Sequence, residues 1–344
     1  MKDVRLVLIG IGNLGRRFCR ILSDKQEHLR NHMRLNLTLV GAADSQGAAY
    51  DPTKGLDPMR IVELKAAGGS VADYPDVGRT GWLATDLVSS VRADVLLEAS
   101  PVTLEQGAEP ALSCIRTAIR RRMHVVTPNK GPLVVGYDEL HELAASYEVE
   151  LRFDGTVAGG LPALSIGQRD LRGAVISRLQ AVPNLCTGYV MDMLADGLSW
   201  EEAIARAREG GALEGDGSWD LEGWDAAAKL VILANSVLAV PARISDVNRS
   251  GITHLKPGDL HAAERRGERY RLLADAELTA EGDYRLSVKP TPLTADHPLG
   301  RLRSKQMGIV YETDIYGTIT AIIEEPDPVP SAATMLRDIL DIYG

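Results

Sequence analysis

The sequence predicts an α/β protein in which a parallel-sheet domain precedes an α+β domain with an open sheet. Three observations predict this fold class. A buried apolar run at 4–9 is followed by glycines at positions 10, 12 and 15. Strand-like and helix-like segments then alternate as far as residue 153, which is typical of βαβ units with right-handed crossovers. After about residue 155 the pattern changes to a glycine-rich turn, helices and partly alternating strands.

The first half contains five predicted strands. The runs at 4–9 and 35–43 are apolar enough for parallel strands that are buried on both faces, and the second ends at Asp44. The other strand-like runs are 94–98, 123–127 and 149–153. Apolar positions at helical spacing predict helices over 16–29, 104–121 and 137–147.

The second half mixes helices and strands. A helix is expected to begin at Ser199, because Ser199 and Glu202 have the spacing of a capping box. A second helix, over about 221–238, is apolar nearly all round. The expected strands are 270–276, 283–289 and 308–324, and a final amphipathic helix over 331–342 follows three prolines.

Composition narrows the class of protein. At 344 residues two domains are expected, and the net charge of −9 argues against a nucleic-acid partner, which would require a basic surface. Cys19, Cys114 and Cys186 are an odd number without paired spacing, which fits a reducing compartment. The first residues enter a strand pattern rather than a signal peptide, and no apolar run reaches the ~20 residues that span a bilayer. We therefore expect a cytoplasmic protein with no membrane partner.

The first strand ends in a glycine-rich turn that predicts a Rossmann-type dinucleotide site. The turn consists of Gly10, Gly12 and Gly15 with Asn13 and Leu14 between them. Such glycines let a pyrophosphate approach the N–H groups at a helix N-terminus, although the turn could also serve packing alone. An acid at the end of the second strand, here Asp44, can bond ribose hydroxyls and favours NAD. Three nearby cations could instead hold the 2′-phosphate of NADP: Arg16, Arg17 and Lys54.

Two lysines are candidates for catalysis. Lys130 follows the strand at 123–127 through Thr127 and Asn129, so it is expected beyond the carboxyl end of the sheet, where ligands bind in α/β proteins. A lysine in a surface loop, without a catalytic role, could also follow the strand at this distance. Lys229 lies four residues after Asp225 and among apolar neighbours, so it must pair with an acid, extend to solvent or face a cleft. The alternative is a solvated ion pair of little energetic value.

An acidic, glycine-rich loop precedes the second helix and contains Glu214, Asp216 and Asp220. The acids form either a solvated loop or a site for an ammonium group or a metal ion. His28 and His32 share a helical face but lack the glutamate of an H-E-x-x-H site, so we expect no histidine metal site.

Taken together, these residues resemble the short form of homoserine dehydrogenase, which lacks an added regulatory domain. The resemblance runs from Gly10 to the last helix. It rests on six segments, of which the one around Asp225 and Lys229 is the most specific: GIGNLG (10–15), DSQGA (44–48), TPNK (127–130), GTVAGGLP (155–162), DLEGWDAAAKLVILA (220–234) and HPLG (297–300).

The resemblance implies a domain arrangement and a reaction. Residues 1–154 would bind NADP or NAD, 155–328 would form a catalytic and dimerisation domain, and 329–344 would be a helix that returns to the first domain. The family reduces L-aspartate 4-semialdehyde to L-homoserine in the biosynthesis of threonine, methionine and isoleucine, and a homodimer is expected.

The resemblance also implies roles for single residues. Lys229 and Lys130 would lie near the reacting oxygen beside the nicotinamide, and Asp225 would position substrate and lysine. Substrate-binding residues would be Glu214, Asp220 and Thr187. Cofactor-binding residues would be Gly10, Gly12, Asn13, Leu14, Gly15, Asp44, Thr127 and Asn129. A monovalent cation (Na⁺ or K⁺) would be held by main-chain carbonyls of Asp154, Val157 and Gly159.

The departures from the family cluster near the substrate. The family usually has N-G-T-T-N-Y where this chain has Asn184-Leu185-Cys186-Thr187-Gly188-Tyr189, and it has Tyr at the position of Ala212. A glycine-rich segment near the end is replaced by Glu325-Pro326-Asp327-Pro328. Replacing Gly by Leu removes room beside the substrate. A related oxidoreductase with another small carbonyl substrate therefore remains the alternative, and a nucleotide-binding protein without turnover is the third hypothesis.

Overall fold

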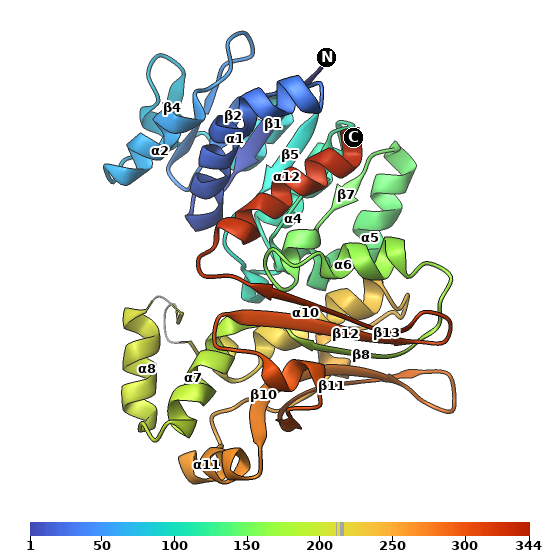
Figure 1. Ribbon diagram of the computed structural model, residues 1–344. Coiled ribbons are helices and arrows are strands. Elements are labelled where there is room, and N and C mark those ends of the chain that lie inside the picture. The colour runs from blue at the N-terminus through green and yellow to red at the C-terminus, as the bar shows by residue number, and fades with distance from the viewer. Residues whose placement is uncertain (211, 214–216) are drawn as a thin grey trace. The chain divides into compact units, whose positions relative to one another are not determined.

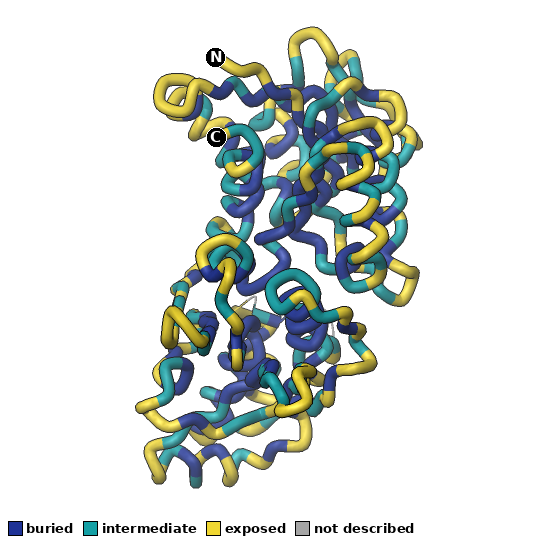
Figure 2. Tube along the Cα trace, turned by 90° about the vertical axis from the view of Figure 1, so that its right-hand side faces the viewer, coloured by how far each residue is buried: buried dark blue, intermediate teal, exposed yellow. Residues whose placement is uncertain are grey.

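The computed structural model describes residues 1–210, 212–213 and 217–344. These residues form two compact units. Unit 1 comprises Met1–Gly160 and Asp327–Gly344, and unit 2 comprises Leu161–Pro326 (Figure 1). In each unit buried residues lie inside and exposed residues lie on the outside (Figure 2), and the edge strands β4 (Gly78–Thr80) and β13 (Gly317–Glu324) contain no buried residue. None of the helices in the described part of the chain has the length and apolar character needed to cross a membrane.

Unit 1 contains a seven-stranded sheet with the order β4-β3-β2-β1-β5-β6-β7. Five strands run parallel, as predicted: β1 (Lys2–Ile9), β2 (Leu35–Ala43), β5 (Val95–Glu98), β6 (His124–Val126) and β7 (Leu151–Arg152). β3 (Gly47–Tyr50) and β4 (Gly78–Thr80) extend the β2 edge in antiparallel pairing. The prediction of a parallel-sheet α/β domain is confirmed.

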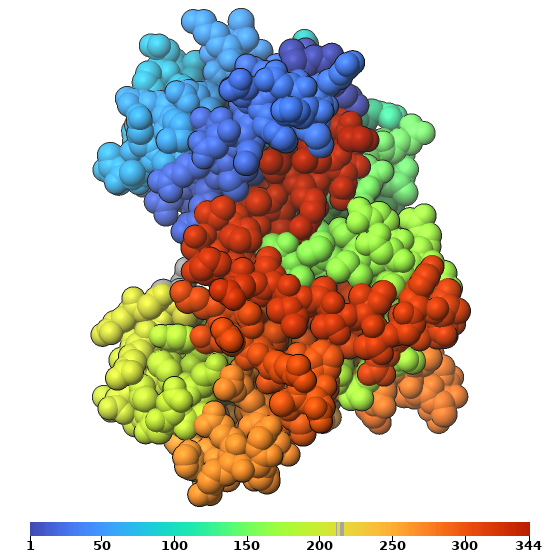
Figure 3. All heavy atoms as spheres, in the orientation of Figure 1, coloured from blue at the N-terminus to red at the C-terminus, as the bar shows by residue number. Residues whose placement is uncertain are grey.

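The helices of unit 1 pack on this sheet and on one another. They are α1 (Asn13–His32), α2 (Pro58–Ala66), α3 (Ala84–Ser90), α4 (Ala111–Arg120), α5 (Lys130–Tyr147) and α12 (Val329–Tyr343), with short 3₁₀ turns η1 (Val71–Asp73), η2 (Leu104–Gln106) and η3 (Asp154–Thr156). α12 lies against α1 although the two are more than 290 residues apart in the chain (Figure 3). Ala332, Met335 and Ile339 of α12 belong to the same buried cluster as the residues of β1.

Two helices of unit 1 differ from the prediction. The helix expected over 104–121 begins only at Ala111, because Gly107 adopts a left-handed conformation (φ +66°) and Pro110 cannot continue a helix. The helix expected over 137–147 is present as the part of α5 after a kink at Gly136 (φ −135°, ψ 36°), and a further helical part from Lys130 precedes that kink. The Asn129 side chain caps it by accepting a hydrogen bond from the Gly131 N–H at 3.0 Å.

Unit 2 contains a six-stranded sheet with the order β13-β12-β8-β10-β11-β9. Its strands are β8 (Ile176–Val182), β9 (Asn248–Arg249), β10 (Glu268–Leu278), β11 (Tyr284–Thr294), β12 (Gln306–Thr313) and β13 (Gly317–Glu324). All neighbours pair antiparallel except β11 and β9. The prediction of an open, mostly antiparallel sheet is confirmed.

The helices of unit 2 include α7 (Leu185–Ala195), α8 (Trp200–Glu209) and α10 (Trp224–Ser236). The remaining helical segments are α6 (Ala163–Ser165), η4 (Ile166–Asp170), α9 (Ser218–Leu221), η5 (Ile244–Asp246), α11 (Pro257–Arg265) and η6 (Pro298–Arg301). The capping box of Ser199 and Glu202 that the sequence predicts is present at the start of α8. Nine residues of α10 are buried, in agreement with its apolar composition.

Candidate active site

The glycine-rich turn connects β1 to α1. Gly10 has φ +90°, and a side chain there would lie 2.4 Å from the backbone of Ala99. A Cβ on Gly15 would lie 2.1 Å from the Gly10 carbonyl oxygen, whereas a Cβ on Gly12 would meet no atom within 4 Å. Packing therefore requires glycine at positions 10 and 15. At Gly12 the absent side chain leaves open space at the N-terminus of α1, which suits a pyrophosphate.

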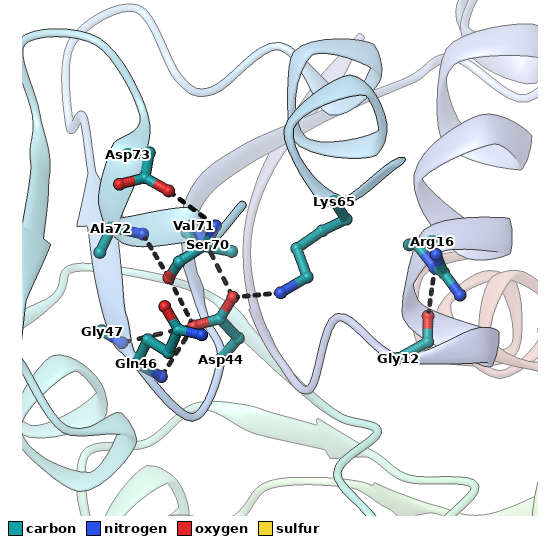
Figure 4. A network of polar contacts seen from close by, with 10 residues as sticks. All are labelled: Gly12, Arg16, Asp44, Gln46, Gly47, Lys65, Ser70, Val71, Ala72 and Asp73. Carbon is teal, nitrogen blue, oxygen red and sulfur yellow. Dashed lines mark hydrogen bonds and ion pairs between the residues drawn. The ribbon is translucent and has the colours of Figure 1, made fainter. Parts of the chain in front are cut away.

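Asp44 lies at the end of β2 and is enclosed by donors (Figure 4). The donors to Oδ1 are Gln46 N at 3.0 Å, Gly47 N at 3.3 Å and Ser70 Oγ at 2.8 Å, and those to Oδ2 are Lys65 Nζ at 2.8 Å and Val71 N at 3.0 Å. Burial alone would raise the pKa of Asp44, but the hydrogen bonds from Lys65, Val71, Gln46 and Ser70 outweigh it and hold the pKa below its usual value. A ribose hydroxyl that bonds Asp44 must displace one of these donors.

The cations that could hold a 2′-phosphate are arranged differently. The Arg16 Nε atom donates to the Gly12 carbonyl oxygen at 3.2 Å, on the α1 side of the view in Figure 4. Arg17 donates to Asn13, and Lys54 is exposed. Lys65, which sequence reasoning did not single out, neutralises Asp44 as an ion pair. The argument for NAD that rests on a free acid at Asp44 is weakened by this pairing.

A cavity of about 230 Å³ opens beside this network. Asp44, Gly47, Trp82 and Pro110 are among its lining residues. The Arg79 guanidinium lies 4.9 Å from the centre of the Trp82 ring, which holds the aromatic side chain from one face. The cavity is at the carboxyl end of β2, the position where the adenosine half of a dinucleotide binds in such sheets.

A second polar cluster lies at the carboxyl ends of β5 and β6. Glu98 is fully buried, and burial raises its pKa although donors from Ser100, Asn129 and Thr127 oppose the shift. Thr127 Oγ1 donates to the Glu98 carbonyl at 3.0 Å, and Asn129 N donates to Thr127 Oγ1 at 3.0 Å. These contacts fix the turn that precedes Lys130, which is the first residue of α5.

In unit 2 the lysine of α10 is held by an acid and a carbonyl. Lys229 Nζ lies 2.7 Å from Asp225 Oδ2 and donates to the Pro183 carbonyl oxygen at 2.7 Å. Only 13% of the Lys229 side chain and 7% of the Asp225 side chain are exposed. The solvated ion pair that the spacing alone allowed is thus excluded. The amine is fixed at the end of β8 with little solvent around it.

Residues at the start of α7 lie near this pair. The Asn184 Nδ2 atom donates to Asp220 Oδ1 at 2.5 Å and to Asp225 Oδ2 at 2.7 Å. Thr187 is fully buried, and its Oγ1 atom has no hydrogen-bond partner among the residues that the structure describes. Burial, followed by the charges of Asp220 and Asp225, raises the pKa of the Cys186 thiol to about 12, so this thiol is not a nucleophile at neutral pH.

Some predicted residues have other surroundings or lie outside the description. Glu214 and Asp216 lie outside the described residues, so the structure places only Asp220 of the acidic loop. The turn expected to hold a cation is buried at Val157, and the Asp154 carboxylate forms an ion pair with Arg337 at 2.8 Å. Sequence reasoning missed Lys65, Glu98 and the bridging contacts of Asn184. An asparagine just before a helix indicates an N-cap, and Asn184 caps α7 by accepting the Thr187 N–H. The sequence does not indicate that Asn184 also donates to Asp220 and Asp225.

The parallel sheet, the glycine turn with open space at Gly12, and the buried acid–lysine pair define a dinucleotide-binding protein of the dehydrogenase class. The family model of homoserine dehydrogenase matches residues 162–340, and that of the NAD binding domain of homoserine dehydrogenase matches residues 10–154. The chain belongs to the homoserine dehydrogenase family.

Relatives of known name match along the whole chain. A homoserine dehydrogenase of Methanocaldococcus jannaschii is 33% identical and covers 98% of both chains. An NAD(+)-dependent homoserine dehydrogenase of Pseudomonas canavaninivorans is 30% identical over 100% of this chain and 97% of its own.

Solved structures agree with this. A hyperthermophilic archaeal homoserine dehydrogenase in complex with NADPH has a TM-score of 0.84 and 25% identity, over 99% of this chain and 98% of its own. The Thermoplasma acidophilum enzyme also has a TM-score of 0.84 and 25% identity, over 98% of both chains.

Proposed function

We propose that the chain is a homoserine dehydrogenase that reduces L-aspartate 4-semialdehyde to L-homoserine with NAD(P)H. The observation that carries this proposal is the buried pair of Asp225 and Lys229, anchored at the Pro183 carbonyl, in a chain whose family is homoserine dehydrogenase. The same proposal places the product in the biosynthesis of threonine, methionine and isoleucine.

The proposed roles of the lysines follow from the negative charge that develops on the substrate during the reaction. NAD(P)H supplies the hydride that converts the aldehyde carbon to an alcohol carbon. The carbonyl oxygen then carries developing negative charge, which Lys229 and Lys130 stabilise and to which a lysine supplies a proton. Asp225 holds Lys229 in place, at 2.7 Å. A fixed amine with little water around it stabilises the developing charge more strongly than a solvated amine does, because no solvent has to reorganise during the reaction.

The proposed substrate contacts use the acids of unit 2. Asp220 and Glu214 bind the ammonium group of the substrate, and Thr187 contributes its hydroxyl, which has no hydrogen-bond partner within the described chain. Asp220 and Asp225 both accept hydrogen bonds from the Asn184 amide, so two carboxylates lie close together in this cluster. Neighbouring carboxylates suit an amino-acid aldehyde, which carries an ammonium group, better than an uncharged carbonyl compound.

The proposed cofactor site lies in residues 1–154. The turn from Gly10 to Gly15 with Asn13 and Leu14 holds the pyrophosphate, the cavity beside Asp44 takes the adenosine half, and Thr127 and Asn129 face the nicotinamide half. Open space at Gly12 and the Trp82-lined cavity support this assignment. Both NAD and NADP remain compatible with it, since Lys65 neutralises Asp44.

A different small carbonyl substrate is the second candidate. It is favoured by Leu185 and Cys186, which occupy the first turn of α7 next to Asn184 and fill the place where the family usually has Gly and Thr. Turnover with aspartate semialdehyde that saturates at low concentration supports the first candidate. Cofactor binding without such turnover supports the second.

Lysine removal tests the mechanism. We expect Lys229→Met to lower kcat by about 10³-fold, the usual size for a lost acid or charge-stabilising group, with an unchanged Kd for NADPH. Lys289→Met changes an exposed lysine of the same unit and is the matched control. Steady-state rates from NADPH absorbance and a fluorescence titration check both statements. A Lys229→Met enzyme that keeps more than half of the wild-type kcat excludes the proposed mechanism.

The remaining proposals concern the oligomeric state, the cellular location and the extent of the catalytic domain. We propose a homodimer, supported by exposed apolar side chains around the edge strand β13 at Ile315, Tyr316 and Ile322; its mass would be about twice 37.1 kDa in light scattering. We propose a cytoplasmic location, supported by three buried free cysteines. Residues 155–328 would form the catalytic and dimerisation domain.

We also propose a bound Na⁺ or K⁺ at the carbonyls of Asp154, Val157 and Gly159. The turn is supported in this role by left-handed residues at Ala158 (φ +54°) and Gly159 (φ +58°), which expose successive carbonyls in different directions. Turnover in KCl, NaCl and choline chloride at equal ionic strength tests this proposal.

A further inference from the structure

The junction between β8 and α7 contacts Asp220, Asp225 and Lys229, which together we call the acid–lysine cluster. β8 ends at Val182, and the next two residues, Pro183 and Asn184, lead into α7. The Pro183 carbonyl accepts a hydrogen bond from Lys229, and the Asn184 amide donates to both Asp220 and Asp225. Two adjacent residues thus hold three side chains that lie 36 to 46 residues further along the chain.

The side chain of Asn184 uses both ends of its amide. Its oxygen accepts the Thr187 N–H at 3.2 Å and so caps α7. Its nitrogen has two protons, and each is directed at a different carboxylate, at 2.5 Å and 2.7 Å. Asn184 itself is buried, with 7% exposure, so water cannot replace these donors without rearrangement.

The bridge has an electrostatic consequence. Two neighbouring carboxylates repel each other, and a hydrogen-bond donor placed between them reduces this repulsion. The Asn184 amide supplies such a donor to each acid. The Asn184 amide therefore fixes the positions of both carboxyl groups relative to each other and to Lys229.

We propose that Asn184 is a positioning residue whose single amide sets the relative placement of Asp220 and of the Asp225–Lys229 pair. This inference rests on the proposed function of that cluster. Asn184 does not contact the reacting atoms. It acts through the two acids, and its loss is expected to misplace them by a fraction of an ångström, which is enough to slow a reaction that depends on aligned groups.

Two substitutions separate the bridge from the helix cap. Serine and aspartate both cap helices about as well as asparagine, so Asn184→Ser and Asn184→Asp retain the cap of α7. Asn184→Ser removes the amide donors, and Asn184→Asp replaces them with a third carboxylate. We expect kcat/KM for aspartate semialdehyde to fall by about 100-fold in Asn184→Ser and further in Asn184→Asp. The Kd for NADPH is expected to stay unchanged in Asn184→Ser, whereas the melting temperature is expected to fall slightly because two acceptors lose their donor.

A double-mutant cycle tests whether Asn184 affects kcat/KM through Asp220. If Asn184 acts through Asp220, then Asn184→Ser costs much less in an Asp220→Asn background than in the wild type. Ser199→Asn, which exchanges one good cap for another at the start of α8, is the matched control and is expected to leave kcat and KM unchanged.

Either of two kinetic results would overturn the inference: kcat/KM within twofold of wild type in Asn184→Ser, or losses that multiply independently in the double variant. A parallel loss of melting temperature and NADPH binding would equally overturn it, since Asn184 would then be only structural. Failure of the proposed function is a separate result, because the wild-type enzyme itself would then show no turnover with aspartate semialdehyde.

Discussion

Buried carboxyl groups in this chain differ in how their charge is balanced. Asp44, Asp154 and Asp225 each form an ion pair with a lysine or arginine. Asp338 on α12 has a different environment: it is 2% exposed, and its Oδ2 accepts the backbone N–H of Asp154 at 3.2 Å. Burial, then the neighbouring charge of Asp154, raises the pKa of Asp338 to about 8, although Arg337 lowers it in part.

This shift predicts a pH-dependent stability. The folded protein binds the Asp338 proton more tightly than the unfolded chain does, so the contribution is fully present at low pH and is lost as the pH rises from about 4 to about 8. Asp338→Asn keeps an acceptor for Asp154 and stays neutral. We expect this variant to be more stable than wild type at pH 8, by roughly 1–4 kcal/mol.

Thermal unfolding between pH 5 and pH 8 measures the difference. Asp24→Asn, at an exposed position of α1, is the control for losing one negative charge. Equal melting temperatures of Asp338→Asn and wild type at pH 8 would contradict the assignment of the raised pKa.

At the residue scale, the sequence predicts contacts that are local and misses contacts that are not. The pairing of Asp225 with Lys229 was predictable because residues four apart share a helical face. The bridge from Asn184 to the same acid was not, because it joins residues 41 positions apart and depends on how β8 meets α10. For the same reason Lys65, 21 positions from Asp44, was not recognised as its partner.

At the scale of elements, the turn between β1 and α1 assigns different tasks to its glycines. Gly15 permits close packing of α1 against the Gly10 carbonyl, and Gly12 borders open space. Alanine at the two positions therefore has different expected effects, although the chemical change is the same.

We expect Gly15→Ala to destabilise unit 1, because its Cβ would lie 2.1 Å from the Gly10 oxygen and the backbone must move. Gly12→Ala is expected to melt within a few degrees of wild type, since its Cβ would meet no atom within 4 Å. The same variant is expected to bind NADPH about tenfold more weakly, a cost of about 1.4 kcal/mol, because the methyl group occupies the space of the pyrophosphate. Melting curves and NADPH fluorescence titrations of both variants test this pattern, and tight NADPH binding by Gly12→Ala would refute it.

The elements that were predicted well have strong local signals. β2 has the predicted bounds, Leu35–Ala43, because its mostly buried, mostly apolar residues lie between the polar residues Arg34 and Asp44. The start of α4 was predicted wrongly, because helical spacing of apolar residues continued through Gly107 and Pro110, which the periodicity does not weigh. The part of α5 after the kink at Gly136 matches the helix predicted over 137–147. The part from Lys130 was not predicted, because Asn129 can be recognised as a cap only if the residues after it are known to be helical.

For the whole molecule, the notable feature is that unit 1 is assembled from two distant segments. Its core includes Ala332, Met335 and Ile339 of α12, packed with α1 and β1. A buried Met or Ile side chain contributes about 1.5–3 kcal/mol, so α12 supplies a large part of the stability of a unit of this size.

Removal of residues 327–344 is therefore expected to lower the melting temperature of unit 1 by more than 10 °C and to abolish NADPH binding at room temperature. The loss of Gly344 alone is the matched control and is expected to have no effect. Differential scanning calorimetry with and without NADPH measures both. A truncated chain that binds NADPH with wild-type affinity would show that α12 is dispensable for the unit.

The two-part construction of unit 1 has a consequence for biosynthesis of the chain. Residues 329–343 follow all of unit 2 in the sequence, so they leave the ribosome only after unit 2 has been translated. Until then the apolar face of α1 that α12 covers is exposed, and other nascent chains or chaperones can bind to it. The cofactor-binding half, although it is made first, is the last to acquire its complete interior.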